Sequence, residues 1–279
     1  MTFAELLAEV SRSVGGQPQA RWVLDEVTNS AWSPSGDASA VASAARMMAS
    51  QVSSGRPLQY ALGHWAFRHL DLLVDERVLI PRPETEYVVE RAFQALRKGS
   101  RSSTTCVDLG TGSGAIACAM ATELRGAIAE VTVLGIDVSQ DALDVAALNI
   151  ARTGARVELH RGSWWEGVPV ELEGSVDLVI ANPPYVTEEE YEVLDATVRR
   201  EPKVALVGAI SSEGIAGFSP YEVIVGDAPR FLAPGAVLAF ECAPSQVGPL
   251  RALCEGLGEV TTIVDLAGRD RGVVVECPW

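Results

Sequence analysis

Residues 107–121, "VDLGTGSGAIACAMA", place three glycines directly between a short apolar run and an alanine-rich helical pattern. Gly110, Gly112 and Gly114 allow a tight turn and let the backbone come close to a bound ligand. A glycine-rich turn between a strand and a helix is typical of α/β proteins that bind a cofactor at the helix N-terminus.

The spacing of these glycines separates two cofactor classes. They follow a G-x-G-x-G pattern, whereas the dinucleotide fingerprint needs its third glycine one residue later, where this chain has Ala115. Asp108, just before the turn, would be unfavourable beside a pyrophosphate but is tolerated beside the cation of an amino acid or sulfonium. Both features favour S-adenosylmethionine over a dinucleotide.

Outward from this turn, short apolar runs alternate with helical stretches. Continuous apolar runs are typical of strands buried on both faces, and their alternation with helices predicts a parallel, doubly wound sheet. The last two runs are separated only by "AGRDR", which is too short for a helical crossover. We therefore predict an α/β fold with a mostly parallel seven-stranded sheet whose last strand is antiparallel. The runs are 106–110, 131–137, 156–162, 176–181, 236–241, 259–266 and 272–278.

The N-terminal quarter has a different pattern. Residues 1–55 carry Ala, Leu and Val at helical spacing, which predicts a small helical domain. After Gly63 the pattern becomes strand-like up to "VDER", which predicts a β-hairpin that joins two domains. The sequence thus predicts a helical domain with its hairpin linker over 1–75 and an α/β domain that binds S-adenosylmethionine over 76–279, the latter opening with a helix over 85–99.

Composition limits the classes of function. The chain has 279 residues, 48% of them hydrophobic, and a formal net charge of −15. That acidity argues against binding free nucleic acid, since the phosphate backbone would be repelled. No apolar run reaches the roughly 18 residues that cross a bilayer, and Glu5 and Glu9 interrupt the first apolar segment as no secretory signal would. We expect a cytoplasmic monomer without a membrane segment.

The five cysteines and three histidines are scattered without the paired spacing of zinc sites or disulfide frameworks. We expect reduced thiols and no metal.

Asp137 ends the second apolar run, "VTVLGID". At the carboxyl end of that strand, an acid can accept hydrogen bonds from both hydroxyls of a ribose. It could instead cap the next helix, but Ser139 can supply that cap. After the third run, "RGSWWEG" offers Trp164 and Trp165, either of which could flank an adenine or belong to the core.

The most specific motif is Asn182-Pro183-Pro184-Tyr185, which follows the fourth apolar run. Methyl transfer to a planar NH₂ group requires the nitrogen to be aimed at the methyl carbon while its two hydrogens are held. The Asn182 side-chain oxygen and the Pro183 carbonyl can accept them, the prolines stiffen the loop, and Tyr185 offers a flat face. The alternative is a plain proline turn that ends a strand.

These motifs resemble those of the release factor glutamine methyltransferase family, and the resemblance covers almost the whole chain. It is carried by "GRPLQYALGHWAF" at 55–67, "LIPRPETEYVVERA" at 79–92, "DLGTGSGAIA" at 108–117, "NPPY" at 182–185, "EPKVALVG" at 201–208 and "YEVIVGDAPRFLAPGAVLAFE" at 221–241. The resemblance implies methylation of the glutamine side-chain amide in the Gly-Gly-Gln loop of peptide chain release factors.

The resemblance also implies roles for particular residues. The cofactor would be bound by Gly110, Thr111, Gly112, Ser113, Gly114, Asp137, Trp164 and Asn182. Arg82, Pro83, Glu84 and Thr85 would cover it, although "IPRPETE" by itself is also a plausible start of a helix. Asn182, Pro183, Pro184 and Tyr185 would receive the glutamine, with Asn182, Pro183 and Tyr185 as the catalytic residues. Two loops depart from the family pattern, at 207–221 and at 242–244, which affects the prediction of partner docking more than that of the reaction.

Four other functions compete with this one. A ribosomal-protein glutamine methyltransferase is the nearest, and a nucleic-acid methyltransferase acting on an adenine or guanine amine also fits the motif. Against the latter, the chain shows neither a basic cluster nor a target-recognition domain. A nicotinamide-dependent oxidoreductase and an inactive cofactor sensor would use the same sheet.

Overall fold

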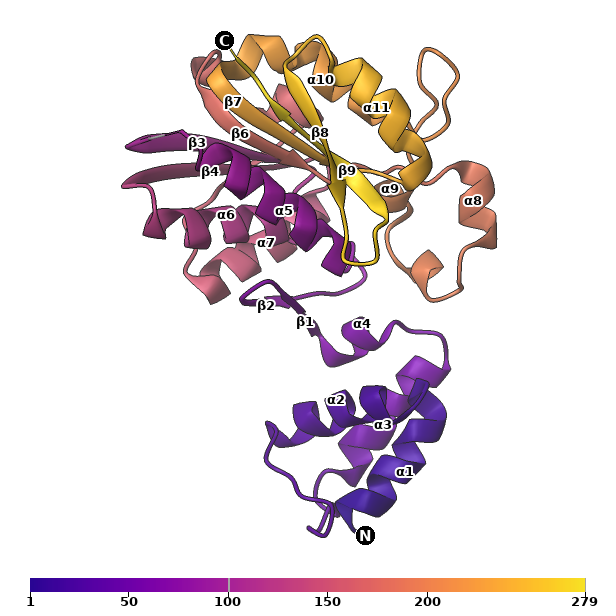
Figure 1. The fold of residues 1–279 in the computed structure, drawn as a ribbon. Coiled ribbons are helices and arrows are strands. Elements are labelled where there is room, and N and C mark those ends of the chain that lie inside the picture. The colour runs from indigo at the N-terminus through magenta and orange to yellow at the C-terminus, as the bar shows by residue number, and fades with distance from the viewer. Residues whose placement is uncertain (100, 279) are drawn as a thin grey trace.

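The computed structural model describes residues 1–99 and 101–278. Figure 1 shows a bundle of N-terminal helices below a twisted sheet that is flanked by helices on both faces. In the described residues, the main sheet has seven strands in the order β5-β4-β3-β6-β7-β9-β8. They are β3 (Ser103–Leu109), β4 (Glu130–Asp137), β5 (Glu158–Arg161), β6 (Val176–Ala181), β7 (Leu232–Glu241), β8 (Glu259–Val264) and β9 (Asp270–Glu276).

Strands β3 to β7 are parallel, and β9 runs antiparallel to both of its neighbours, β7 and β8. The predicted mostly parallel sheet with an antiparallel last strand is therefore confirmed. From β3 the chain first adds β4 and β5 on one side and then returns to add β6 and β7 on the other. The direction of winding thus reverses at β3, and in such sheets ligands bind beside that point, at the carboxyl ends of the strands.

Alternating strand residues divide the core into two layers. In β3, Cys106 lies in the cluster with helices α5 and α6, whereas Val107 and Leu109 lie in the cluster with α10 and α11. Successive side chains of a strand point to opposite faces, so each buried run serves both layers. The helices of this part are α5 (Pro83–Leu96), α6 (Ala115–Glu123), α7 (Gln140–Thr153), α8 (Glu188–Val193), α9 (Lys203–Leu206), α10 (Ser219–Phe231) and α11 (Val247–Cys254).

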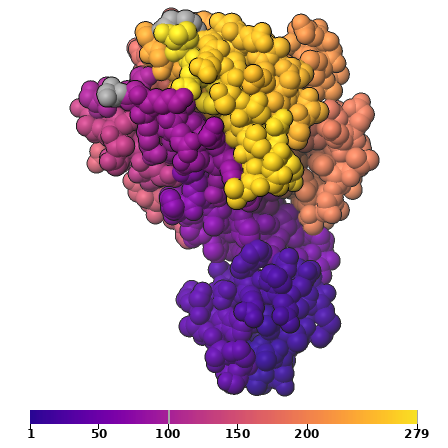
Figure 2. Space-filling model, viewed as in Figure 1, coloured from indigo at the N-terminus to yellow at the C-terminus, as the bar shows by residue number. Residues whose placement is uncertain are grey.

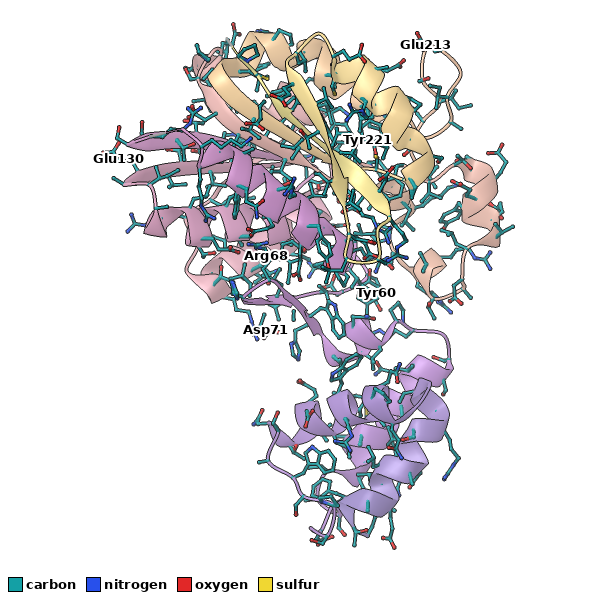
Figure 3. All side chains as sticks on the ribbon, viewed as in Figure 1. Tyr60, Arg68, Asp71, Glu130, Glu213 and Tyr221 are labelled. Atoms are coloured by element: carbon teal, nitrogen blue, oxygen red, sulfur yellow. The ribbon has the colours of Figure 1, made fainter. Side chains whose placement is uncertain are left out.

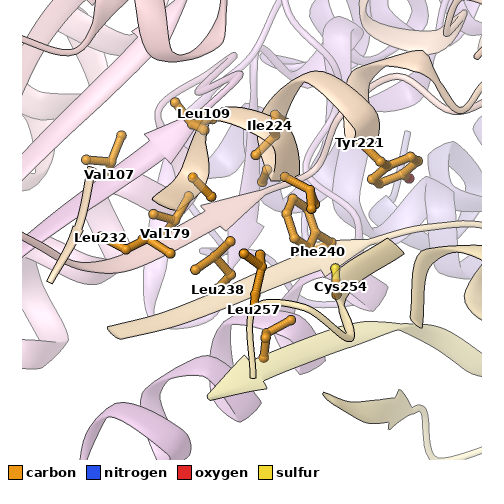
Figure 4. Close-up of a cluster of buried hydrophobic side chains, with 14 of the residues drawn as sticks. Val107, Leu109, Val179, Tyr221, Ile224, Leu232, Leu238, Phe240, Cys254 and Leu257 are labelled. Carbon is orange, nitrogen blue, oxygen red and sulfur yellow. The ribbon is translucent and has the colours of Figure 1, made fainter. Parts of the chain in front are cut away.

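Figure 4 shows the layer beneath α10, where Tyr221 and Ile224 pack on Phe240 and Leu238 of β7. Tyr221 is fully buried and donates its hydroxyl to the carbonyl oxygen of Glu241 at 2.8 Å. This contact anchors the end of β7, the strand end that reaches the candidate site.

Helix α5 begins two residues before the predicted start and ends three residues before the predicted end. Pro83 occupies its first position, where the fixed φ of proline suits a helix and the missing N–H is not needed. Glu84 and Glu86 follow in the first turn, where acidic side chains interact favourably with the helix dipole.

The N-terminal helices have a core of their own. Helices α1 (Phe3–Val14), α2 (Gln17–Thr28) and α3 (Ala42–Ser53) bury Leu6, Val23 and other apolar residues in one separate cluster. The space-filling view in Figure 2 shows this bundle joined to the rest of the molecule through a narrower region. The predicted helical part is confirmed, whereas the domain boundary between 75 and 76 stays a prediction.

The connection consists of α4 (Leu58–Leu62), a short helix that was not predicted, and of the predicted antiparallel hairpin, β1 (His64–Phe67) and β2 (Leu70–Leu73). Figure 3 shows Tyr60 and Asp71 in this region. Tyr60 is buried and donates its hydroxyl to the Val78 carbonyl oxygen at 2.5 Å. His64 contacts Glu26 of α2 at 2.8 Å and also Asp71, so polar contacts tie the bundle to the hairpin.

None of the helices formed by the described residues combines the length and the apolar character that crossing a membrane requires.

Candidate active site

The three glycines of the motif after β3 all have positive φ: +81° for Gly110, +54° for Gly112 and +79° for Gly114. A Cβ on Gly112 would have nothing within 4 Å, so this side of the turn is open to a ligand. A Cβ on Gly114 would meet Ala146 at 3.2 Å, so the third glycine lets α6 approach α7 closely. The turn therefore combines an open backbone with tight helix packing.

Asp108 lies near the end of β3, just before this turn. It is fully buried, and its Oδ2 accepts from the Thr111 hydroxyl at 2.6 Å and from the Ala117 amide at 3.0 Å. Burial raises the pKa of its carboxyl group to about 7. The sequence suggested that the Asp108 carboxylate lies beside the cofactor's cation. Asp108 lines neither of the two cavities of the site, which are described below. Its direct contacts brace the glycine turn.

Asp137 stands at the carboxyl end of β4, beside the turn. Its two side-chain oxygens accept from the backbone amides of Gly112 at 2.8 Å and Ser139 at 2.9 Å. Each oxygen of a carboxylate has two lone-pair directions, so each can accept one further hydrogen bond. The helix cap is supplied by Ser139, whose Oγ accepts from the Ala142 amide. Asp137 is thus available to a ligand, and burial raises the pKa of its carboxyl group.

The two tryptophans have different surroundings. Trp165 is buried in the core, stacks on Phe231 and donates its indole N–H to the Ile224 carbonyl oxygen at 2.8 Å. Trp164 has a positive φ of 50° and lies against Gly110, whose Cβ would meet the indole ring at 3.4 Å. Of the pair, it is Trp164 that faces the glycine turn.

Some of these residues line a cavity of about 270 Å³. It lies beside the point where the sheet winding reverses, and its size approaches the roughly 300 Å³ at which small-molecule sites begin. Its walls include Gly110, Gly112, Asp137, Trp164, Asn182 and Pro184. Open glycine backbone, a carboxylate with free lone pairs and an indole ring together fit a nucleoside.

A smaller cavity of about 50 Å³ adjoins the first, since Gly110, Gly112 and Asn182 line both. Arg82 and Thr85 line it from the segment that precedes and opens α5, while Pro83 is exposed. The Arg82 guanidinium pairs with Glu201 at 2.5 Å, and Glu201 also accepts the Ile80 amide at 3.0 Å. The segment 80–85 is thereby held over the glycine turn.

The motif Asn182-Pro183-Pro184-Tyr185 follows β6 directly, as its position in the sequence predicted. Asn182 and Pro184 line the larger cavity, whereas Pro183 is buried. Tyr185 lines neither cavity and turns its hydroxyl to Glu241 Oε1 at 3.3 Å.

The backbone of this motif is supported from behind by the loop after α9. A Cβ on Gly208 would lie 2.2 Å from the Pro184 carbonyl oxygen, and one on Gly217 would lie 2.2 Å from that of Tyr185. Gln246 donates its side-chain amide to the carbonyl oxygens of Tyr185 and Gly217, both at 3.3 Å. Only glycine allows this approach, so the loop that departs from the family pattern sets the position of the acceptor motif.

Asn182 itself is held by a short series of hydrogen bonds. Its Nδ2 donates to Thr85 Oγ1 at 3.2 Å, and the Thr85 hydroxyl donates to Glu241 Oε2 at 2.5 Å. Thr85 and Glu241 are 4% and 3% exposed, so water has almost no access to either. Burial raises the pKa of the Glu241 carboxyl group to about 7, although the hydroxyls of Thr85 and Tyr185 oppose that shift.

Several of these residues were not identified from the sequence: Glu201, Gly208, Gly217, Glu241 and Gln246. Glu201 and Gly208 fall in "EPKVALVG" and Glu241 ends the apolar run "AVLAFE", which are the signals that could have pointed to them. The described residues contain no cluster of three or more His, Cys, Asp or Glu side chains that could hold a metal ion.

The chain is similar in sequence and in fold to known methyltransferases. The model of the methyltransferase small domain family matches residues 91–204. A release factor glutamine methyltransferase of Gloeobacter violaceus is 41% identical over 82% of this chain and 77% of its own. The enzyme of that name from Xylella fastidiosa is 36% identical over 86% of this chain and 84% of its own. A methyltransferase structure from Pyrococcus furiosus shares the fold at a TM-score of 0.51 and 17% identity, over 86% of this chain and 100% of its own.

Proposed function

Since the chain belongs to the release factor glutamine methyltransferase family, we propose that it methylates the side-chain amide nitrogen of the glutamine in the Gly-Gly-Gln loop of peptide chain release factors. The protein is an S-adenosylmethionine-dependent methyltransferase. When bound, S-adenosylmethionine supplies a methyl group on a sulfonium, which is an electrophile for the amide nitrogen.

The position of Asn182 is the observation that carries the proposal. Its Nδ2 is engaged by Thr85, which leaves Oδ1 as a free acceptor in a residue that lines both cavities. A hydrogen-bond acceptor at this place can hold one N–H of a planar amide beside the cofactor site. The Pro183 carbonyl is the second acceptor in the proposal, so that both hydrogens are held while the nitrogen lone pair faces the methyl group.

The cofactor-binding residues in the proposal are Gly110 to Gly114, Asp137, Trp164 and Asn182. The open side of Gly112 gives a ligand access to the turn. Asp137 has a free lone-pair direction on each oxygen for the ribose hydroxyls, and the Trp164 ring borders the same cavity. Arg82, Thr85 and the exposed Pro83 form the proposed cover, which the contact of Arg82 with Glu201 holds in place.

The acceptor-binding residues in the proposal are Asn182, Pro183, Pro184 and Tyr185. The ring of Tyr185 is the proposed flat surface for the glutamine amide, while its hydroxyl contacts Glu241. A general base is not needed before transfer, because the amide nitrogen becomes acidic once it carries the methyl group and then loses its proton. The reaction thus depends on orientation rather than on a titrating side chain in contact with the acceptor.

A transfer assay tests the proposal. Purified release factors are incubated with the enzyme and cofactor carrying a labelled methyl group, beside versions whose Gly-Gly-Gln loop has the Gln→Ala substitution. We expect label on the unaltered factors alone. Label that survives the substitution, or that appears on a ribosomal protein or nucleic acid instead, contradicts the proposed acceptor.

Asn182→Ala is the matching enzyme variant. Because it removes one of two acceptors that aim the amide, we expect methyl transfer to fall about 100-fold. Asn182 is only one of several residues that line the cofactor cavity, so the dissociation constant for S-adenosylhomocysteine, measured by titration calorimetry, should rise by far less than about 100-fold. Unchanged transfer by this variant would rule out the assigned role.

The proposal includes a monomer in the cytoplasm. The five cysteines are free and buried, which suits a reducing compartment. Light scattering on the purified chain tests the monomer, and fractionation of cells tests the location.

A further inference from the structure

Three polar side chains from separate elements form a series of hydrogen bonds that ends at Asn182. Glu241 closes β7, Thr85 lies in the first turn of α5, and Asn182 follows β6. We propose that Glu241 and Thr85 are positioning residues that fix the orientation of the Asn182 amide, so that its oxygen faces the methyl acceptor. This inference rests on the proposed function for the identity of that acceptor.

Proton counting at Thr85 gives the series its direction. A threonine hydroxyl has one hydrogen and two lone pairs. The hydrogen goes to Glu241, because a carboxylate oxygen accepts but cannot donate and the two oxygens are 2.5 Å apart. Towards Asn182, therefore, Thr85 only accepts. Asn182 must present its NH₂ group to Thr85, and its oxygen is directed away from Thr85.

Without this constraint, the side-chain amide could turn over at little cost in shape. Its oxygen and nitrogen are nearly the same size, so only hydrogen-bond partners decide between the two orientations. In the turned orientation, the NH₂ group of Asn182 would meet the NH₂ group of the acceptor, and two donors repel. The direction set at Thr85 thus determines whether Asn182 is an acceptor at the reaction site.

The charge of Glu241 is what imposes this direction. Its two oxygens receive the hydroxyls of Thr85 and Tyr185, and Tyr221 holds its backbone carbonyl. Of the charged groups around it, Arg271 of β9 favours the carboxylate and Glu84 of α5 opposes it. When Glu241 takes up a proton, it becomes a donor, and Thr85 is then free to donate to Asn182.

Thr85 is not needed for the local structure of α5. The N-cap residue of this helix, Arg82, makes no side-chain cap, and the Thr85 backbone amide bonds to the Arg82 carbonyl oxygen at 3.1 Å. The Thr85 hydroxyl points instead to Glu241 and Asn182. A valine at this position keeps the shape of the side chain and removes only the hydroxyl that links Glu241 to Asn182.

The first experiment measures kcat for release-factor methylation and the dissociation constant for S-adenosylhomocysteine. Thr85→Val should lower kcat about tenfold, and Thr85→Ser should restore most of the rate. Cofactor affinity should change by clearly less than kcat, because valine keeps the shape of Thr85 in the proposed cover. Thr104→Val is the control, because Thr104 is equally buried at the start of β3 and its hydroxyl faces Cys106. It should keep the full rate. A Thr85→Val enzyme with unchanged kcat, or one that Thr85→Ser does not rescue, overturns the inference.

A double-mutant cycle tests whether Thr85 acts through Asn182. If it does, Thr85→Val lowers the single-turnover rate in the unaltered enzyme but has no further effect in Asn182→Ala. An equal loss in both backgrounds shows that Thr85 acts by another route and overturns the inference.

The pH profile of the rate is a second test, and it concerns Glu241. The rate should fall as the pH drops through about 7 in the unaltered enzyme but stay flat and lower in Glu241→Gln. The same inflection in both enzymes contradicts the role of Glu241.

A measurement without substrate separates this inference from the proposed function. The side-chain amide of Asn182 is followed by ¹⁵N NMR and assigned by its absence in Asn182→Ala. Thr85→Val should make its hydrogens exchange with water faster, whereas Thr104→Val should not. If release factors are not methylated but this exchange pattern holds, the proposed acceptor is wrong and the positioning series stands. If methylation proceeds but exchange is unchanged, the series is wrong.

Discussion

The contact between Gly217 and Tyr185 allows a quantitative test of how the acceptor motif is positioned. Gly217 has a φ of +68°, and a Cβ there would lie 2.2 Å from the Tyr185 carbonyl oxygen. Real Cβ atoms essentially never come closer than 3.0 Å to a neighbour, so Gly217→Ala must displace the Tyr185 backbone or the loop by about 0.8 Å. The perturbation therefore reaches the acceptor motif without altering any of its residues.

Gly214 supplies the matched control. It lies in the same loop with a φ of +82°, but a Cβ there would have nothing within 4 Å. Alanine at either position costs about 1–2 kcal/mol because the left-handed region is unfavourable for a residue with a Cβ. The difference between Gly217→Ala and Gly214→Ala thus isolates the contact with Tyr185 from the strain that both variants share.

A displacement approaching 1 Å in a group that aims a reacting atom costs about 100-fold in rate. We expect single-turnover methyl transfer to fall by about that factor in Gly217→Ala and by less than about threefold in Gly214→Ala. The affinity for S-adenosylhomocysteine should change far less than the rate, since neither Gly217 nor Tyr185 lines the larger cavity. Equal rates in the two variants would refute the idea that the loop positions the acceptor motif.

Two further predictions concern the cofactor site. Asp137→Asn removes a carboxylate oxygen that can accept from the ribose, so the dissociation constant for S-adenosylhomocysteine should rise about tenfold by calorimetry. The control Asp141→Asn, at an exposed acid of α7, should not change it, and equal affinities would exclude the ribose role. Arg82→Met leaves Glu201, 4% exposed, without its cation, so urea denaturation should show a loss of about 1–3 kcal/mol. Arg46→Met, at an exposed pair with Glu9, should show little change, and similar losses in both would contradict the assigned importance of Glu201.

The sheet was predictable because each of its strands is a local pattern. A continuous apolar run between turn signals identifies a strand buried on both faces, and the short "AGRDR" link excludes a helical crossover. The place of β9 was not predicted, since it pairs with β7 as well as with β8. Which distant strand pairs with β9 depends on side-chain packing over the whole sheet. No short stretch of sequence therefore predicts that β9 pairs with β7.

The same distinction applies to the site. Asp137 and Asn182 could be identified because Asp137 ends one apolar run and Asn182 directly follows another, and strand ends meet at one edge of a parallel sheet. Gln246 and Gly217 could not, because they act on the Tyr185 backbone from 61 and 32 residues away in the sequence. Neither belongs to a motif with chemistry of its own. The roles of the site residues themselves stay predictions until the variants are measured.

Because β9 lies between β7 and β8, the sheet cannot be completed until residues 270–276 have been synthesised. Before that, β7 has an unpaired edge on the side that β9 will occupy, and such edges recruit other extended chains. Any nascent or truncated chain that ends before β9 is therefore prone to aggregate. Glu241, at the end of β7, pairs with Gly272 of β9, so the pairing that covers this edge also reaches the strand end beside the candidate site.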